Sequence, residues 1–171
     1  MTEIKEITKY EDKVRVVEKI IADLPEWFGK GVKISDIEKV SGSFKNMLVF
    51  AAYENHDAVG FISIKRPTPN AAEIGDLGVL LSMHGHGIGK KLVAYSEEYC
   101  RKNGIDFLTV KTIDESSSNN SYKGTRAFYK ALKFKPIDVL PTLWGEGFPC
   151  LYLIKCITGA FSKQQHCGSA G

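Results

Sequence analysis

Two hydrophobic periods alternate along this chain and divide it into elements. Residues 3–8 alternate polar and apolar side chains in steps of two, which is typical of a short edge strand. Apolar residues then recur at helical spacing and predict an amphipathic helix over residues 11–24, which Pro25 ends. An aromatic turn at 25–31 and a weaker helical pattern ending near Gly42 follow.

Three segments between residues 46 and 81 predict strands. Residues 46–53 and 59–64 are apolar, flank a polar turn and predict a β-hairpin. Residues 66–70 contain two prolines and predict a loop that cannot continue a central strand. Residues 72–81 predict another long strand, whose two internal glycines are typical of a bulge or of a close backbone approach.

The second half of the chain continues with alternating helices and strands. We expect helices at 88–103 and 122–133, and strands at 105–113, 134–140 and 150–157. The element order predicts an α/β (α+β mixed) fold, in which helices cover a mixed sheet. We expect residues 1–157 to form a single domain and the polar tail at 158–171 to be flexible.

Charge and length restrict the class of protein. The 171 residues suit one domain with one core. Twenty-three basic and 20 acidic residues give a net charge of +3, which is too weak to predict a nucleic-acid partner. No apolar run is long enough to span a bilayer, so we expect no membrane partner.

The cysteines and the N-terminus indicate a cellular compartment. The four cysteines form no C-x-x-C pair, and no histidine cluster at zinc spacing stands nearby, so we expect free thiols and no metal site. The first 13 residues are charged and contain no apolar signal core. These features predict a cytoplasmic protein.

The glycine-rich turn between the strand at 72–81 and the next helix carries the strongest chemical signal. It reads His84-Gly-His-Gly87-Ile-Gly89-Lys90. Glycines allow tight bends and let backbone N–H groups approach a ligand. A helix N-terminus adds unpaired N–H groups and partial positive charge, so a pyrophosphate is the natural partner. The structural alternative is a helix start that uses glycine only to turn.

Two other phosphate motifs do not fit this turn. A P-loop needs four residues between its glycine and its GK pair, but Gly85 and Gly89 enclose three, and Lys91 replaces the hydroxyl. The dinucleotide fingerprint fails because its third glycine comes one residue early. We therefore do not expect a kinase or a dehydrogenase.

The element order and two motifs of residues 3–157 resemble the GNAT superfamily of N-acetyltransferases. The first motif is the glycine turn, in which His84 stands where the family usually has Gln or Arg. The second is the late helix with the pair Phe128 and Tyr129. In this second motif Lys133 replaces a usual glycine, and Tyr122 lies near the place of a usual asparagine.

The resemblance implies a GNAT-like fold and acetyl-coenzyme A as cofactor. It implies a central mixed six- to seven-stranded sheet, flanked by about four helices and splayed between its fourth and fifth strands, residues 72–81 and 105–113. The pantetheine arm would bond to the main chain at Leu77, Gly78 and Val79. The other cofactor-binding residues would be His84, Gly85, His86, Gly87, Ile88, Gly89, Lys90, Thr125, Phe128 and Tyr129.

Acetyl transfer to an amine needs a base, because an alkylamine with a pKa of about 10 is charged at neutral pH. It also needs an acid for the departing thiolate, and the resemblance assigns Tyr129 to that role. Glu73 and Asp76 are the candidate bases. Ideal alternation puts them on opposite faces of a strand, but a glycine bulge would change that phase. The choice between them, or a water chain, stays open.

The resemblance places the acceptor pocket beside the segment after the first helix. Trp27 and Phe28 lie there, and Trp144 in the last connection would add another wall. The acceptor would be a small-molecule or protein amine, and a homodimer is compatible with this interpretation. Two functions remain: an N-acetyltransferase, or a non-catalytic module that binds or senses acyl-coenzyme A on the same fold.

Overall fold

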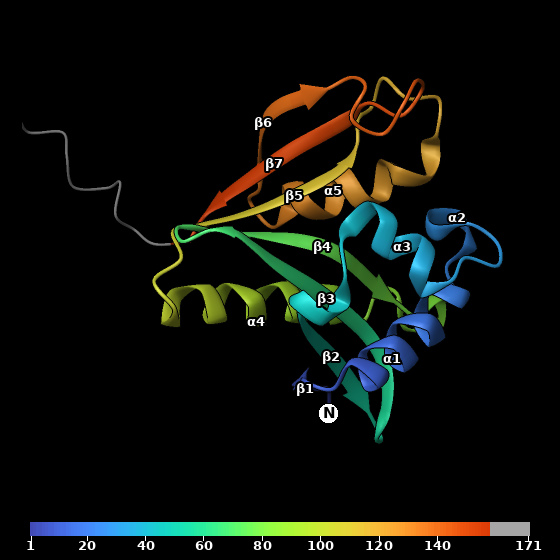
Figure 1. Cartoon of the computed structure of the whole chain (residues 1–171), viewed down its shortest axis with the longest axis vertical. Helices are drawn as coiled ribbons and strands as arrows, with labels where there is room; N and C mark the ends of the chain where they lie inside the picture. Colours follow the sequence, from blue (N-terminus) through green and yellow to red (C-terminus); the bar gives the residue numbers. More distant parts are fainter. Residues whose placement is uncertain (158–171) are drawn as a thin grey trace, which may run out of the picture.

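Residues 1–157, which the computed structural model describes, fold around one mixed β-sheet (Figure 1). The predicted flexible tail at 158–171 lies outside the described residues. The sheet has seven strands in the order β1-β2-β3-β4-β5-β7-β6, all antiparallel except the pair β4 and β5. The strands are β1 (Glu3–Ile7), β2 (Leu48–Glu54), β3 (Asp57–Thr68), β4 (Ala71–Val79), β5 (Phe107–Ile113), β6 (Lys135–Leu140) and β7 (Cys150–Cys156).

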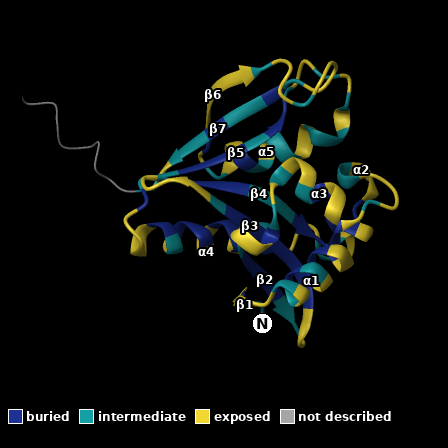
Figure 2. Cartoon of the chain, viewed as in Figure 1, coloured by how far each residue is buried: buried dark blue, intermediate teal, exposed yellow. Residues whose placement is uncertain are grey.

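Helices cover both faces of this sheet (Figure 2). They are α1 (Tyr10–Ala22), α2 (Pro25–Phe28), α3 (Ile34–Ser41), α4 (Ile88–Lys102) and α5 (Lys123–Ala131). Side chains of α1 and α3 pack with one cluster on the sheet, which includes Phe61. The α4 helix packs with the other cluster, to which Ile62 and Tyr129 belong. The fold class predicted from the sequence is therefore confirmed, with α2 as a one-turn helix in the expected aromatic turn.

The predicted hairpin is present, but its second strand is longer than expected. Asn55 and His56, at φ of 49° and 70°, form the tight turn between β2 and β3. The expectation of a loop over residues 66–70 is wrong, because β3 continues through Pro67 to Thr68. This end of β3 is exposed and its register is irregular, so the missing N–H of proline costs no regular ladder bond.

A bulge in β4 changes which residues share a face of the sheet. On β3 two steps separate Ile62 from Ile64, but their partners on β4, Leu77 and Ile74, are three residues apart. One extra residue therefore stands on β4, opposite Ser63. A Cβ on Gly75 would lie 2.8 Å from the Ser63 hydroxyl, so the bulge needs a glycine there. Glu73 and Asp76 consequently lie on the same face, the one covered by α1 and α3.

The sheet opens between β4 and β5. The two strands pair from Ala71↔Phe107 to Ile74↔Val110 and then separate. Beyond that point β5 continues to pair with β7, as far as Ile113↔Cys150. Figure 1 shows the two halves of the sheet converging at one end and diverging toward α2 and α3. The splay that the family resemblance implied is therefore confirmed.

Candidate active site

The opening between β4 and β5 holds a cavity of about 1460 Å³. Its walls come from both strands, from α2, α3 and α5, and from the turn before α4. Of the site residues expected from the sequence, those that line it are Trp27, Phe28, Glu73, Asp76, Leu77, Gly78, Val79, His84, Gly85, Gly87, Ile88, Gly89, Lys90, Thr125, Phe128, Tyr129 and Trp144. His86 is exposed, outside this lining, and its Nδ1 contacts the His84 carbonyl at 3.0 Å.

The glycine turn presents a row of backbone amides to the mouth of this cavity. Gly85 and Gly87 adopt left-handed φ values of 79° and 77°, and Gly87 directly precedes α4. Within the described chain, no N–H group of residues 85–90 donates to a backbone carbonyl. A Cβ added to either glycine would meet no atom within 4 Å, so the space above the amides is open. The turn can therefore accept an anion.

The His84 side chain fastens this turn to the end of β4. Its Nε2 lies 2.8 Å from the Val79 carbonyl oxygen. Because a carbonyl can only accept, Nε2 carries the proton and donates it. The ring also meets Trp27 edge-on, with centroids 6.0 Å apart. His84 thus anchors the turn, and the ligand-facing groups of the turn are main-chain amides.

The start of α4 packs closely on α5. A Cβ on Gly89 would lie 3.3 Å from the Phe128 ring and 3.8 Å from Leu77. A side chain at Gly89 would therefore press on the Phe128 ring, while Leu77 would stay in ordinary contact. This close approach explains why the third glycine of the turn is needed for packing.

Asp76 lies on the cavity wall with two serine partners. The Ser41 hydroxyl donates to its Oδ1 at 3.1 Å, and its backbone N–H donates to Ser63 Oγ at 2.8 Å. Burial raises the pKa of the Asp76 carboxyl to about 6, although the two serines and Lys65 act in the opposite direction. A carboxylate with such a pKa is ionised at neutral pH and suits a general base.

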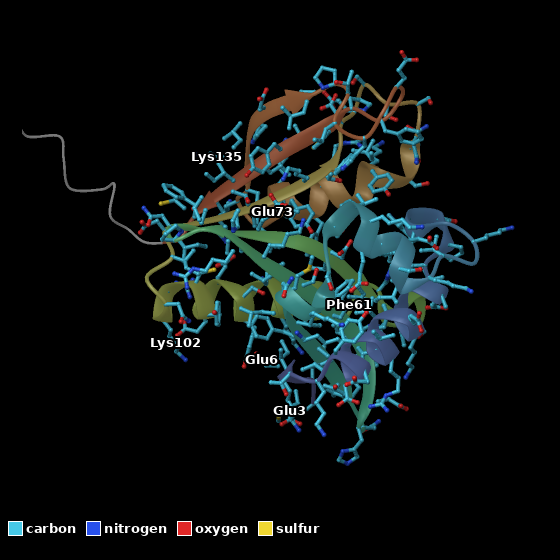
Figure 3. All side chains as sticks on the ribbon, in the orientation of Figure 1. Glu3, Glu6, Phe61, Glu73, Lys102 and Lys135 are labelled. Atoms are coloured by element: carbon cyan, nitrogen blue, oxygen red, sulfur yellow. The ribbon has the colours of Figure 1, made fainter. Side chains whose placement is uncertain are left out.

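Glu73, the other candidate base, has both carboxylate oxygens engaged by lysines. Lys65 Nζ lies 3.3 Å from Oε1, and Lys111 Nζ pairs with Oε2. The side chain is 11% exposed and lies on β4 close to its junction with β5 (Figure 3). Asp76 forms no ion pair in the described part of the chain. Of the two carboxylates, Asp76 is thus the one available to take a proton.

Tyr129 faces the same cavity from α5. Its side chain is 4% exposed and packs edge-on against Phe128 and Phe134, at centroid distances of 5.1 and 5.3 Å. Burial raises the pKa of the Tyr129 hydroxyl, and the Asp76 carboxylate raises it further. Tyr129 therefore stays protonated at neutral pH and has a proton to give. Asp76 and Tyr129 belong to opposite faces of the sheet and influence each other through its opening.

Residues 16–134 match the model of the acetyltransferase (GNAT) family. The chain belongs to this family. As a GNAT acetyltransferase, it uses acetyl-coenzyme A as the donor and an amine as the acceptor. A search of curated protein sequences finds no match.

Solved structures share the fold of this acetyltransferase at low sequence identity. A protein assigned to the GNAT family from Desulfovibrio desulfuricans is 17% identical, with a TM-score of 0.76 over 92% of this chain and 100% of that one. An aminoglycoside 6'-N-acetyltransferase from Enterococcus faecium is 20% identical, with a TM-score of 0.70 over 91% and 97%. A GNAT acetyltransferase from Elizabethkingia anophelis with acetyl-CoA bound is 14% identical, with a TM-score of 0.70 over 91% and 97%.

Aromatic residues form further walls of the cavity of this acetyltransferase. Trp27 and Phe28 come from α2, and Trp144 comes from the connection between β6 and β7. The Tyr122 hydroxyl donates to the Trp27 carbonyl at 2.9 Å and joins the segment before α5 to α2. Within residues 1–157, no helix is long and apolar enough to cross a membrane.

The polar residues of this site that sequence reasoning missed include Ser41, Ser63, Lys65 and Lys111. Only Ser63 carried a usable signal, because it is the one polar residue in an otherwise apolar strand, VGFISI. A buried serine at such a position needs a hydrogen-bond partner. The two lysines look like ordinary polar positions in the sequence, and only the pairing of β3, β4 and β5 brings them to Glu73.

Proposed function

We propose that this GNAT enzyme acetylates a primary amine by direct attack in a ternary complex, with Asp76 as general base and Tyr129 as general acid. The observation that supports this most is their placement in one opening. Asp76 lines the cavity from β4 and Tyr129 lines it from α5. The unpaired amides of residues 85–90 lie at its mouth.

The cavity fits acetyl-coenzyme A, which supplies the thioester-activated acetyl group when bound. The amides of residues 85–90 would hold its pyrophosphate, because they have no backbone acceptor among the described residues and the space above Gly85 and Gly87 is open. Lys90 adds a positive charge beside them. Residues 75–79 have lost β5 as a pairing partner. Their main-chain groups at Leu77, Gly78 and Val79 are therefore available to the pantetheine arm.

The two titrating groups divide the proton transfers between them. At neutral pH Asp76 is ionised, since its pKa is about 6, and it takes the proton that the acceptor ammonium must lose. Tyr129 holds its proton and gives it to the departing sulfur. The hydrogen bonds from Ser41 and to Ser63 fix the Asp76 side chain and its backbone at the bulge. Trp27, Phe28 and Trp144 enclose the acceptor.

We also infer a cytoplasmic location, supported by the buried thiols Cys100 and Cys150. Burial raises the pKa of the Cys100 thiol to about 11, so it stays protonated and behaves as a core residue. The homodimer stays a prediction, which light scattering would test.

Calorimetry with coenzyme A and a thiol-release assay test this function together. We expect saturable heat of binding, and thiol release only when acetyl-coenzyme A and an amine are both present. The absence of any heat would overturn the proposal. Tight binding without turnover across a broad amine panel would instead indicate the alternative, an acyl-coenzyme A-sensing module.

A further inference from the structure

Two lysines share one carboxylate in the cavity, on the face that α1 and α3 cover. Lys65 and Lys111 bind different oxygens of Glu73. Their side chains are 31% and 26% exposed, against 11% for Glu73, and all three residues line the cavity. Lys111 also lies 4.7 Å from the centre of the Tyr152 ring. Glu73 thus faces two positive charges, and the ionised Asp76, on which Lys65 also acts, is the second negative charge on this face.

Asp76 balances the second lysine only while it is ionised. In the part of the chain that the structure describes, the carboxylates that line it are Asp36, Glu73 and Asp76. Asp36 is already paired with Lys39 at 3.0 Å, at the exposed rim. Asp76 is reserved for the amine, and it becomes neutral when it takes the proton. The acceptor end therefore has no spare carboxylate for a second positive charge on the acceptor.

The lining of this cavity also includes exposed apolar side chains. Val40, Leu143 and Phe148 line the cavity and are 68%, 48% and 48% exposed. Trp27 and Trp144 line the same cavity. Exposed apolar side chains around a cavity indicate a ligand with an apolar body.

We propose that the acceptor is a zwitterion, an amino acid-like molecule with a primary amine, a carboxylate and an apolar or aromatic body. This inference rests on the proposed function and names its substrate class. The carboxylate would lie against Lys65 and Lys111, while the amine faces Asp76. The apolar body would pack on Trp27 and Trp144.

Charge balance favours this class over a polycation. With a zwitterion bound, the acceptor carboxylate and Glu73 offset the two lysines, and the acceptor ammonium offsets Asp76. A monoamine without a carboxylate leaves one buried positive charge unpaired, and a polyamine leaves several, which is costly in a low-dielectric site. The fold shared with the Enterococcus faecium enzyme therefore does not carry its acceptor class over to this chain.

The reaction itself balances with this acceptor. The amine nitrogen forms a bond to the acetyl carbon, and the bond between that carbon and sulfur breaks. The electron pair of the broken bond leaves with the sulfur, which takes the Tyr129 proton. The ammonium gives one proton to Asp76 on becoming the attacking amine, and the nitrogen then passes its second proton to the Tyr129 phenolate, which restores the phenol. The product is an N-acetyl amino acid.

Three amines test the substrate class in the thiol-release assay: L-phenylalanine, its decarboxylated counterpart phenethylamine, and the polycation spermidine. We expect kcat/KM for L-phenylalanine, corrected for the fraction of neutral amine, to exceed that for phenethylamine at least tenfold, with spermidine lowest. Calorimetric titration of the same amines into coenzyme A-saturated protein gives the preference without turnover. The same order of affinity is expected there.

Variants of Lys65 test whether this lysine cluster causes the preference for L-phenylalanine over phenethylamine. Lys65→Met leaves Lys111 and Glu73 as a balanced pair, so we expect KM for L-phenylalanine to rise about tenfold and KM for phenethylamine to change less than twofold. Lys65→Arg keeps the positive charge and should retain the preference for L-phenylalanine. Lys102→Met, in an exposed ion pair with Glu98 on α4 and outside the cavity lining, is the matched control and should leave both values unchanged.

The outcomes separate this inference from the function on which it rests. Phenethylamine or spermidine binding and reacting as well as L-phenylalanine would overturn the zwitterion proposal and leave the acetyltransferase intact. An unchanged preference in Lys65→Met would also overturn it. Coenzyme A binding with no acetylation of any amine would contradict the proposed function, while the calorimetric order of the amines would still decide the charge argument.

Discussion

The donor and acceptor ends of one cavity are built in different ways. The donor end consists of backbone amides from one continuous segment, residues 85–90, at the start of α4. The acceptor end consists of side chains that α2, α3, β3, β4, β5 and the connection between β6 and β7 bring together. A site made of main chain tolerates many side chains, whereas a site made of side chains changes its ligand with single substitutions.

This difference matches the two tasks of the enzyme, which are binding a coenzyme common to the family and selecting an acceptor. The coenzyme is common to the family, and a backbone turn is enough to hold its pyrophosphate. Under the proposals above, Asp76, the Lys65–Glu73–Lys111 cluster and the aromatic walls select the acceptor. Substitutions at the two ends should consequently separate donor binding from turnover.

The largest expected effect is at Asp76. We expect Asp76→Asn to lower kcat by about 10²- to 10⁴-fold, the usual contribution of a general base, and to leave the coenzyme A dissociation constant unchanged. In the unsubstituted enzyme kcat/KM should fall as the pH drops through about 6, because the carboxylate becomes protonated there. Rates between pH 5 and 8 and calorimetry at pH 7 measure both. A variant with full activity would exclude Asp76 as the base.

Stability provides the control for this substitution. The pKa of Asp76 rises on folding from its ordinary 3.8 to about 6, so the folded state favours the protonated form. Below pH 4 Asp76 is protonated in both states and does not change the free energy of unfolding. Above pH 6 its ionisation lowers the free energy of unfolding by about 2–3 kcal/mol. Asp76→Asn should be more stable than the parent by that order at pH 7.5 and equally stable near pH 3.5. Urea unfolding at both pH values checks the sign.

Tyr129→Phe tests the acid on the opposite wall. We expect kcat to fall about 10- to 100-fold, because the departing sulfur must then take its proton from water. The ring still packs on Phe128 and Phe134, so coenzyme A affinity and melting temperature should change little. An unaltered rate across the pH range would remove Tyr129 from the mechanism.

A pair of glycines at the two ends of α4 tests the donor end. Gly87 and Gly104 have φ of 77° and 64°, and an added Cβ meets nothing within 4 Å at either. Each alanine substitution should cost about 1 kcal/mol of stability from left-handed strain. Only Gly87→Ala should weaken coenzyme A binding, about tenfold, because its methyl group enters the space above the amides. Equal affinities in calorimetry would show that the turn does not bind the coenzyme.

The smallest expected effect lies outside both ends, at Lys133. This residue has a φ of 70° directly after the cap of α5, where the resemblance implies glycine. Lys133→Gly should raise the free energy of unfolding by about 0.5–1 kcal/mol, because glycine adopts this conformation without strain. Activity and coenzyme affinity should stay unchanged. Denaturant unfolding measures the gain, and a loss of stability would contradict the strain argument.

Local signals made the donor end predictable from sequence. Glycines 85, 87 and 89 lie in one short segment between a strand and a helix, and hairpin and cap signals are equally local. The order of elements and two motifs were enough for the fold. The error over residues 66–70 arose because the exposed, irregular end of β3 tolerates Pro67, which a regular central strand would not.

The acceptor end depends on contacts between distant residues, and the sequence left it open. Whether Glu73 and Asp76 share a face is decided by the bulge at Gly75, which exists because of its partner Ser63 on β3. The pairing of Glu73 with Lys111 spans the parallel pair of β4 and β5. The pattern of apolar and polar residues along β4 alone predicts neither the bulge at Gly75 nor the pairing of Glu73 with Lys111.

The hydrogen bond from Tyr122 to the Trp27 carbonyl joins two walls of the cavity. Beside the cavity, β4 and β5 are joined by four residue pairs at one end, and this bond spans the gap at the other. Breaking it costs about 1 kcal/mol and leaves every rung of the ladder in place. Tyr122→Phe would therefore loosen the link between α2 and the segment before α5 without disturbing the sheet.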